Sequence, residues 1–174
     1  GSTVQALRIA LRDDPSFWLE VEDLAAAPAT FATIDRARVA QEPTGDTVVQ
    51  IADRVRAEEL RVVSRPRPRD ARRYRLQVGP AVARIDLVDG RVTLLDRAGE
   101  PRLTSPVPFA VDAHGAVRAA TVTLVDRVLS VDVDLHDLAF PVTIDPAWIL
   151  VGSLSTARLN HVAFRVPSGK VVVA

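Results

Sequence analysis

Acidic residues gather near the end of one predicted strand and are the candidate metal ligands of the sequence. Asp132 and Asp134 alternate with apolar residues, so both carboxylates lie on one face of that strand, and Asp137 follows shortly after. Hard cations such as Ca²⁺ prefer several oxygen ligands at short range, so these three carboxylates could bind calcium. Pairing with Arg118 or Arg127 across the sheet is the other use of the same residues. Because arginine is abundant and no calcium-loop motif occurs, we favour ion pairing.

Arginines and prolines alternate between residues 65 and 73, where the sequence reads RPRPRDARR. The prolines lack the N–H groups that a sheet needs, so we expect an extended connection at the surface. One interpretation is a docking patch for an anionic polysaccharide or an acidic partner. The other is a solvated loop that nearby aspartates balance. The ligand candidates of this segment are Arg67, Arg69, Arg72 and Arg73.

Two tryptophans are the aromatic candidates for stacking on a sugar ring. Trp18 stands between Phe17 and Leu19, so it lies on the opposite face of its strand, either at a partner interface or on the second face of the sheet. Trp148 is expected to cover the end of the core as a large apolar side chain, with its N–H bonded to a nearby carbonyl. Sugar stacking is the alternative role of both rings.

Length and composition exclude several classes of site. The chain has 174 residues, with 22 basic and 22 acidic side chains and no cysteine. A neutral chain lacks the net basic surface that nucleic acid requires, and thiolate metal sites need cysteine. The sequence has no Gly-x-Ser-x-Gly elbow, no phosphate-binding glycine loop and no apolar run near the roughly 20 residues of a membrane helix. We therefore expect no catalytic residue, no cofactor, no nucleic-acid partner and no membrane insertion.

Apolar residues alternate with a period of two through most of the sequence, which predicts half-buried strands. Residues 34–40 fit a strand or a short helix equally well. Short strands about 8 to 12 residues apart, with Gly, Asp and Pro between them, are typical of a sandwich or barrel. The sequence therefore predicts an all-β fold, an antiparallel β-sandwich of short strands. The predicted strands lie at 7–11, 17–21, 47–51, 60–63, 74–78, 82–88, 92–95, 109–111, 117–125, 128–135 and 140–144.

Two motifs in the second half of the chain resemble those of a known family. Residues 109–115 read FAVDAHG and residues 140–148 read FPVTIDPAW. They resemble a module that precedes kelch-like or Rhs-type repeat arrays in large bacterial surface proteins, especially those of arginine-rich myxobacteria. Earlier segments at 45–49, 56–60 and 89–99 stand in the order that this resemblance implies.

Four residues of these motifs have expected structural roles. Asp112 precedes Gly115 at a spacing that suits an Asx turn, in which the carboxylate accepts backbone N–H bonds. Asp145 precedes Pro146, where extended backbone and then a turn are favoured. We therefore expect both aspartates to shape turns.

The C-terminal residues resemble the first half of a kelch repeat. Residues 152–161 read GSLSTARLNH and residues 167–174 read PSGKVVVA, which places Arg158, His161 and Gly169 at kelch motif positions. The resemblance implies that His161 packs within a blade. A half-blade predicts a C-terminal β-hairpin from a truncated kelch-like blade. This hairpin packs on the sandwich, exchanges with a second copy to form a dimer, or leaves an exposed edge.

These patterns divide the chain into consecutive parts. Gly1 and Ser2 resemble the remnant of a removed tag. Residues 3–44 supply the N-terminal strands, residues 45–148 form the sandwich module, and residues 149–174 form the partial kelch-like repeat.

The resemblance implies a non-enzymatic structural or interaction module of a secreted or cell-surface bacterial protein, which presents or caps a repeat array. Its expected partners are other domains of that protein, with a surface glycan or a protein partner as alternatives. A second interpretation is a carbohydrate-binding module that uses exposed tryptophan and arginine side chains. A third is an accessory domain of a hydrolase whose active site lies outside these residues.

Overall fold

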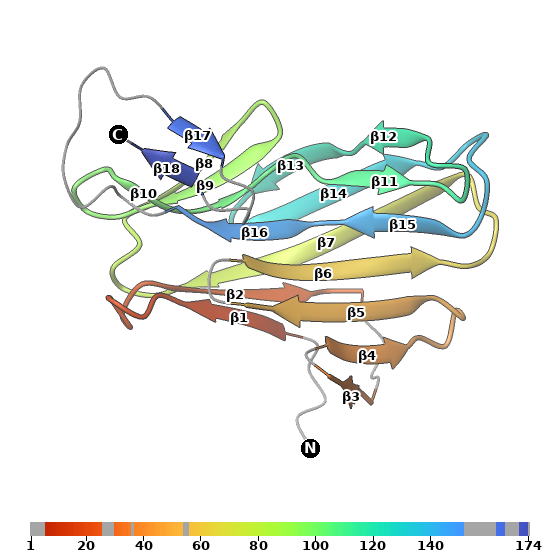
Figure 1. Cartoon of the computed structure of the whole chain (residues 1–174), viewed down its shortest axis with the longest axis horizontal. Helices are drawn as coiled ribbons and strands as arrows, with labels where there is room; N and C mark the ends of the chain where they lie inside the picture. The colour runs from red at the N-terminus through yellow and green to blue at the C-terminus, as the bar shows by residue number, and fades with distance from the viewer. Residues whose placement is uncertain are drawn as a thin grey trace.

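The described residues form antiparallel strands arranged in two large sheets (Figure 1). The computed structural model describes residues 6–25, 30–35, 37–53, 56–151, 163–165 and 171–173. Within these ranges there is no helix, and the strands run along the long axis of the molecule. The two sheets pack their apolar faces against each other, so the predicted all-β antiparallel sandwich is confirmed.

One layer is a five-stranded sheet that begins with the predicted N-terminal hairpin. Ala10 pairs with Trp18, and the N–H of Leu11 donates to the carbonyl of Phe17 at 3.1 Å to close the connection. In spatial order, the five-stranded sheet consists of β1 (Ala6–Ala10), β2 (Trp18–Asp23), β7 (Arg69–Val78), β14 (Val128–Asp134) and β13 (Thr121–Val125).

The other layer is an eleven-stranded sheet built around β6. On one side β6 pairs with β5, and on the other it pairs with β15 and β16, which follow each other along it (Figure 1). Beyond these two strands the sheet continues from β15 to β11 and β12, and from β16 to β10, β9 and β8. Its strands are β3 (Ala32–Ile34), β4 (Ala37–Gln41), β5 (Thr47–Ala52), β6 (Arg56–Val63), β8 (Arg84–Val88), β9 (Arg91–Leu95), β10 (Pro101–Ser105), β11 (Phe109–Val111), β12 (Val117–Ala119), β15 (Val142–Asp145) and β16 (Ala147–Leu150).

Several local predictions need correction. The predicted strand 117–125 is two strands, because the N–H of Ala120 donates to the carbonyl of Pro108 and the chain crosses there from one sheet to the other. The undecided segment 34–40 is divided between β3 and β4, with Asp35 at φ 52° in the turn. Strands β10 and β16 were not predicted by alternation.

Two apolar clusters fill the space between the sheets. The larger includes Phe17, Leu76 and Trp148, and the smaller includes Val133 and Val142. On β6, Ala57 belongs to the larger cluster and Val63 to the smaller. The inward-facing positions of β6 between Ala57 and Val63 carry polar groups instead of apolar ones.

The C-terminal strands form a small sheet of their own. β17 (Ala163–Arg165) pairs with β18 (Val171–Val173) in antiparallel register, as the predicted hairpin requires. Its assignment to a kelch repeat stays a prediction, and Arg158, His161 and Gly169 lie outside the described residues. The division of the chain into parts also stays a prediction.

Candidate functional site

A cluster of charged side chains lies buried between the two sheets. It draws residues from β2 and β7 of the five-stranded sheet, from β6 of the eleven-stranded sheet, and from the turns before β5 and β7. We call it the ionic cluster, and its members are Asp23, Glu42, Asp46, Arg61, Arg67, Asp70 and Arg72. Charged groups rarely leave water unless each finds a partner, so the contacts within the cluster decide its effect.

Arg61 is the centre of the ionic cluster. Its two terminal nitrogens donate to the two oxygens of Glu42 at 2.8 and 2.5 Å, which is a bidentate pair. One of these nitrogens also donates to Asp46 at 2.8 Å, and Nε lies 3.8 Å from Asp70. The side chains of Arg61, Glu42 and Asp46 are exposed by only 5%, 3% and 0%. Arg61 therefore links a β6 position to the turn that begins β5 and to β7.

Two further arginines complete the ionic cluster. Arg67 donates to Asp46 at 2.8 Å and to Asp70 at 2.5 Å. Arg72, on β7, donates to Asp23 of β2 at 3.3 Å and to Glu42 at 3.2 Å. These contacts tie the five-stranded sheet to the eleven-stranded sheet through ion pairs that are shielded from solvent.

The electrostatics of the ionic cluster follow from burial and pairing. Burial alone would lower the pKa of Arg61, but its pairs with Glu42, Asp70 and Asp46 outweigh burial and raise it. Burial opposes ionisation of Asp46 too, yet Arg67, the Ser64 N–H and Arg61 together lower its pKa. At Arg61 and Asp46, pairing therefore outweighs burial and favours the charged form.

Two carboxyl groups at the rim of the ionic cluster have the opposite tendency. Burial raises the pKa of Asp23, and burial raises the pKa of Glu59 to about 7. Glu59 faces inward from β6 and accepts a hydrogen bond from the Gln50 amide at 2.8 Å. It lines a small apolar cavity together with Tyr74 and Trp148. Glu59 is therefore the group in this region whose protonation changes near neutral pH.

The ionic cluster is suited to holding the sheets in register. Its carboxylates are turned towards guanidinium groups, which occupy the positions where a cation would have to bind. Among the residues that the structure describes, no group of three or more His, Cys, Asp or Glu could hold a metal ion. The site therefore offers charge pairing rather than a coordination sphere.

The carboxylates proposed as calcium ligands on β14 form ion pairs instead, as the preferred interpretation expected, although Asp132 pairs with Arg69 rather than with Arg118 or Arg127. Asp132 accepts hydrogen bonds from Arg69 of the neighbouring β7, and Asp134 lies 3.7 Å from Arg118. Asp137 pairs with the adjacent His136 instead of joining the other two carboxylates. The guanidinium groups supply the positive charge that calcium would have supplied.

The arginine segment begins as the predicted surface connection, since residues 64–68 link β6 to β7 and are mostly exposed, but from Arg69 onward it is part of β7. Arg67 and Arg72 point into the ionic cluster, and their side chains are exposed by 26% and 12%. Arg72 does so from the inward face of β7, which begins at Arg69. Arg69 is exposed but pairs with Asp132, and Arg73 is exposed on the outer side of β7. The expectation of a continuous anionic docking patch is therefore wrong for Arg67 and Arg72.

The two tryptophans lie in different surroundings. Trp148 is 3% exposed and packs in the larger apolar cluster, which confirms its apolar role and excludes it as a sugar platform. Trp18 lies on the outer side of the five-stranded sheet, as expected, and the guanidinium of Arg8 lies 4.4 Å from its ring centroid. The backbone of Gly79 also approaches this ring so closely that an added Cβ would lie 2.6 Å from it. Trp18 is therefore partly covered within the chain.

Asp112, the first motif aspartate, shapes a turn, as predicted. One oxygen of Asp112 accepts the N–H groups of His114 and Ala116 at 2.8 Å, and the other accepts that of Ala139 at 2.9 Å. These bonds, that of Ala139 first, lower the pKa of Asp112, and Gly115 adopts φ +86° in the same turn. This Asx turn is confirmed.

The second motif, at Asp145 and Pro146, lies between two strands of the same sheet. Asp145 ends β15, Pro146 interrupts the ladder, and Ala147 begins β16, so one chain segment pairs twice with β6. The predicted extended backbone at Asp145 is therefore confirmed, but the predicted turn is wrong, because the register with β6 continues unchanged through Pro146.

A cavity of about 580 Å³ opens at one end of the sandwich and was not anticipated. Its lining includes Arg8, Arg12, Arg56 and Arg102 beside aliphatic side chains of β1 and β16. Three of these arginines have acidic neighbours: Arg8 lies near Glu20, Arg56 contacts Glu58 and Asp145, and Arg102 contacts Asp13 and Asp96. Because their charge is largely compensated, the cavity does not favour an anionic ligand.

Comparison with known proteins finds no match among family models, curated proteins or solved structures. The resemblance to modules that precede repeat arrays therefore depends on the motif residues themselves. Within the described ranges, no helix is long and apolar enough to cross a membrane.

Replacing Arg61 with methionine should destabilise the fold strongly. The change removes the partner of Glu42 and Asp46, so buried carboxylates lose their compensation, which typically costs about 3 to 5 kcal/mol. Arg75→Met is the matched control, because Arg75 pairs with Glu22 at the surface, where a pair contributes at most about 1 kcal/mol. Urea unfolding of both variants measures the difference. Equal losses would show that the ionic cluster does not stabilise the fold.

Glu59 should make stability depend on pH near neutrality. The pKa of Glu59 rises from 4.5 to about 7 on folding. The contribution of Glu59 to the free energy of unfolding is therefore complete below its unfolded pKa and is lost as the pH rises through its folded pKa. Up to about 3 kcal/mol of unfolding free energy is involved. Glu59→Gln keeps the acceptor for Gln50 but cannot ionise, so it should remove this part of the slope.

The control for this experiment is Glu58→Gln, on the outward face of the same strand. We expect it to retain the wild-type dependence of unfolding free energy on pH. Chemical denaturation between about pH 5 and pH 8 measures the slope of unfolding free energy against pH, because this range brackets the folded pKa of Glu59. Parallel slopes for wild type and Glu59→Gln would contradict the assignment.

Proposed function

We propose that this chain is a non-enzymatic structural or interaction module of a secreted or cell-surface bacterial protein. Its role is to present or cap the repeat array that the residues after Val151 resemble, and its partners are other domains of that protein. The observation that carries this proposal is the position of β16, from which the chain leaves the sandwich.

Strand β16 is bonded on both sides. Trp148 pairs with Ala57 of β6, and Leu150 pairs with Leu103 of β10. Beyond the strand, the N–H of Val151 donates to the carbonyl of Arg102 at 3.0 Å. With Trp148 buried in the larger apolar cluster, the exit strand is held by two ladders and by a large side chain. The last described residues of the sandwich are therefore held firmly on both sides.

The ionic cluster extends this anchoring to both sheets. Arg61 stands on β6, the same strand that pairs with β16, and Arg72 of β7 shares Glu42 with it. The exit strand, β6 and the five-stranded sheet are thus connected through hydrogen bonds and ion pairs. A unit connected in this way fits a role in spacing or presenting repeats better than a role that requires a mobile lid.

The alternative is a carbohydrate-binding module, and its candidate residues are now fewer. Trp148 and Arg72 are buried, and Trp18 carries Arg8 on one ring face. Exposed Arg73 and Trp18 share the outer side of the five-stranded sheet, but they lie about 20 Å apart by strand geometry. The dimer through the C-terminal hairpin and the accessory role beside a hydrolase stay predictions.

Amide hydrogen exchange of the whole chain should find β16 among the most protected strands. Because both of its sides are paired, its amides should open only with the core, as those of β6 do. The edge strand β1, which has a single neighbour, is the internal comparison. Exchange of β16 as fast as that of β1 would remove the support for an anchored exit.

A glycan array with wild type and Trp18→Ala separates the structural role from carbohydrate binding. The structural role predicts no specific glycan signal from either protein, since the ring of Trp18 is already occupied by Arg8. A signal that is lost in Trp18→Ala would instead establish the carbohydrate-binding module and overturn the proposal.

A further inference from the structure

The outer face of the eleven-stranded sheet is unusually apolar. Directly paired residues of neighbouring strands share a face, so the register identifies the side chains that point away from the core. Val39 of β4 pairs with Val49 of β5, and Val49 pairs with Leu60 of β6. Farther across the sheet, Phe109 of β11 pairs with Asp145 of β15. We call this the outer apolar face, and these residues form its middle row.

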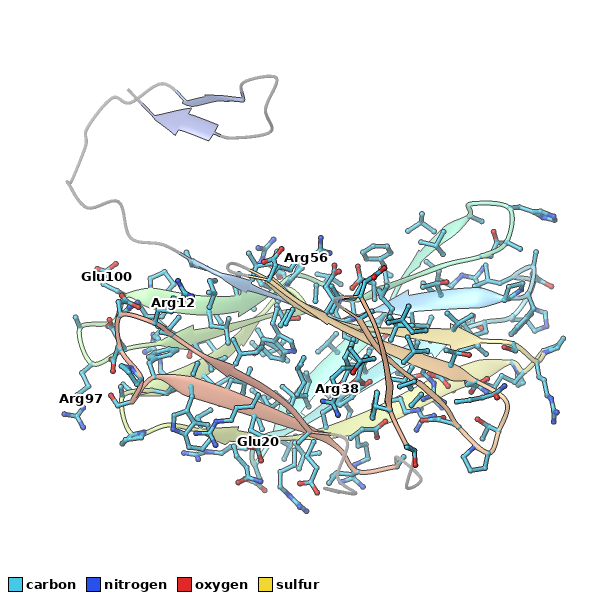
Figure 2. All side chains as sticks on the ribbon, turned by 60° about the horizontal axis from the view of Figure 1, so that its bottom comes forward. Arg12, Glu20, Arg38, Arg56, Arg97 and Glu100 are labelled. Carbon is cyan, nitrogen blue, oxygen red and sulfur yellow. The ribbon has the colours of Figure 1, made fainter. Side chains whose placement is uncertain are left out.

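The outer side of the five-stranded sheet has the opposite character. Its paired positions carry charges of both signs, such as Glu22 with Arg75 at 3.1 Å and Arg69 with Asp132. Figure 2 shows Glu20 of β2 and Arg56 of β6 on opposite sides of the molecule, which locates the two outer faces. Charged cross-strand pairs are the ordinary way in which a sheet faces water, so the outer apolar face is the exception.

Exposed aliphatic side chains extend the outer apolar face to its margins. Ile34 of β3 is 59% exposed, Val117 of β12 is 67% exposed, and Ile149 of β16 is 36% exposed. The pairing register places all three on the same side as Leu60 and Val49. Contiguous apolar patches of this kind are uncommon on monomers and usually mark an interface.

Asp145 is a polar group within this apolar surface. One of its oxygens is buried and has no hydrogen-bond partner, while the other lies 3.5 Å from a terminal nitrogen of Arg56. The Asp145 side chain as a whole is 14% exposed, so a donor from outside the chain would meet its other oxygen. Arg56 is 44% exposed beside it, contacts Glu58 through the same terminal nitrogen, and keeps the N–H groups of its other nitrogens for a second carboxylate.

We propose that the outer apolar face binds the same face of a second copy of this chain, about a two-fold axis that brings Arg56 of each copy to Asp145 of the other. A two-fold interface needs a surface that complements itself. The face meets this condition because its donor and acceptor stand side by side, and its other residues are mostly apolar, with Glu58 as a further charged member beside Arg56. This proposal does not depend on the anchoring role of β16.

The size of the outer apolar face agrees with this occupant. It spans the seven strands from β3 through β4, β5, β6, β15 and β11 to β12, about 29 Å at the usual spacing of strands. With roughly 20 Å along the strands, its footprint is about 600 Å². A standard interface takes about 800 Å² from each partner, so the face could supply most of a modest dimer interface.

Sedimentation equilibrium of the full chain tests the proposal. Wild type should be dimeric at about 100 μM, where even a weak interface is populated. Thr143 lies on the outer apolar face, so Thr143→Arg should weaken dimerisation at least tenfold by placing like charges opposite each other. Thr123→Arg is the matched control on the outer side of the five-stranded sheet and should leave the mass unchanged.

A mixing experiment tests the two-fold arrangement itself. Arg56→Glu and Asp145→Arg should each be monomeric, because each homodimer would place like charges together. Mixed in equal amounts they should form a heterodimer, in which both cross-contacts again join opposite charges. Within each variant chain, positions 56 and 145 carry like charges before and after mixing. Mixing can therefore restore only a contact between two copies.

Each other outcome overturns the proposal. A wild type that stays monomeric would mean that another partner, or residues 152–174 of the same chain, covers the face. A dimer that Thr143→Arg does not weaken would place the interface elsewhere, as an exchange of the C-terminal hairpin would do. A mixture that stays monomeric would exclude the Arg56 to Asp145 contact between copies.

Discussion

Arg61 and the carboxylates around it are removed from water, so their charges must be balanced inside the fold. This requirement restricts how the strands can pair. A slip of β6 by one residue would turn Arg61 towards solvent and bring Leu60 inward, which would leave Glu42 and Asp46 without their main partner. Apolar contacts alone tolerate such changes better, because one aliphatic side chain can replace another. The ionic cluster therefore gives the sandwich a single acceptable alignment.

The alternation of apolar residues was enough to predict most strands, because nearly every strand has one face in the core. The same alternation contained a signal for the ionic cluster. Asp70 and Arg72 share the inward face of β7 with Tyr74 and Leu76, although charged residues at such positions are ordinarily assigned to solvent. The partners themselves could not be predicted. Glu42 and Asp46 stand 19 and 15 residues before Arg61, and only the folded chain brings them to it.

Two other sites show the same limit. Carboxylates that share a strand face are compatible with calcium binding and with ion pairing, and the choice depends on Arg69, which is 63 residues away in sequence. Trp148 and Trp18 are equally plausible as sugar platforms by residue type. Their difference arises because Trp148 faces the core from β16, whereas Trp18 faces outward from β2. Sequence patterns identify faces, but tertiary pairing decides what each face meets.

The two outer surfaces give the sandwich a chemical polarity. The five-stranded sheet presents charge pairs such as Glu22 with Arg75, which are well hydrated, while the eleven-stranded sheet presents Val49, Leu60 and Phe109. A module with one hydrated side and one apolar side suits an assembly in which its orientation matters. The comparisons identify no relative, so this polarity and the anchored exit are the features that any functional account must explain.

The position of β16 also determines how the molecule would carry mechanical load. Tension that reaches the sandwich through Val151 is shared between the hydrogen-bond ladders to β6 and β10. Tension through the N-terminal strand acts on β1, which among the described strands has only the ladder to β2. The two ends are therefore mechanically unequal: under stretching, the N-terminal strand would detach first, while the strand that leads to the repeat-like residues would stay in place.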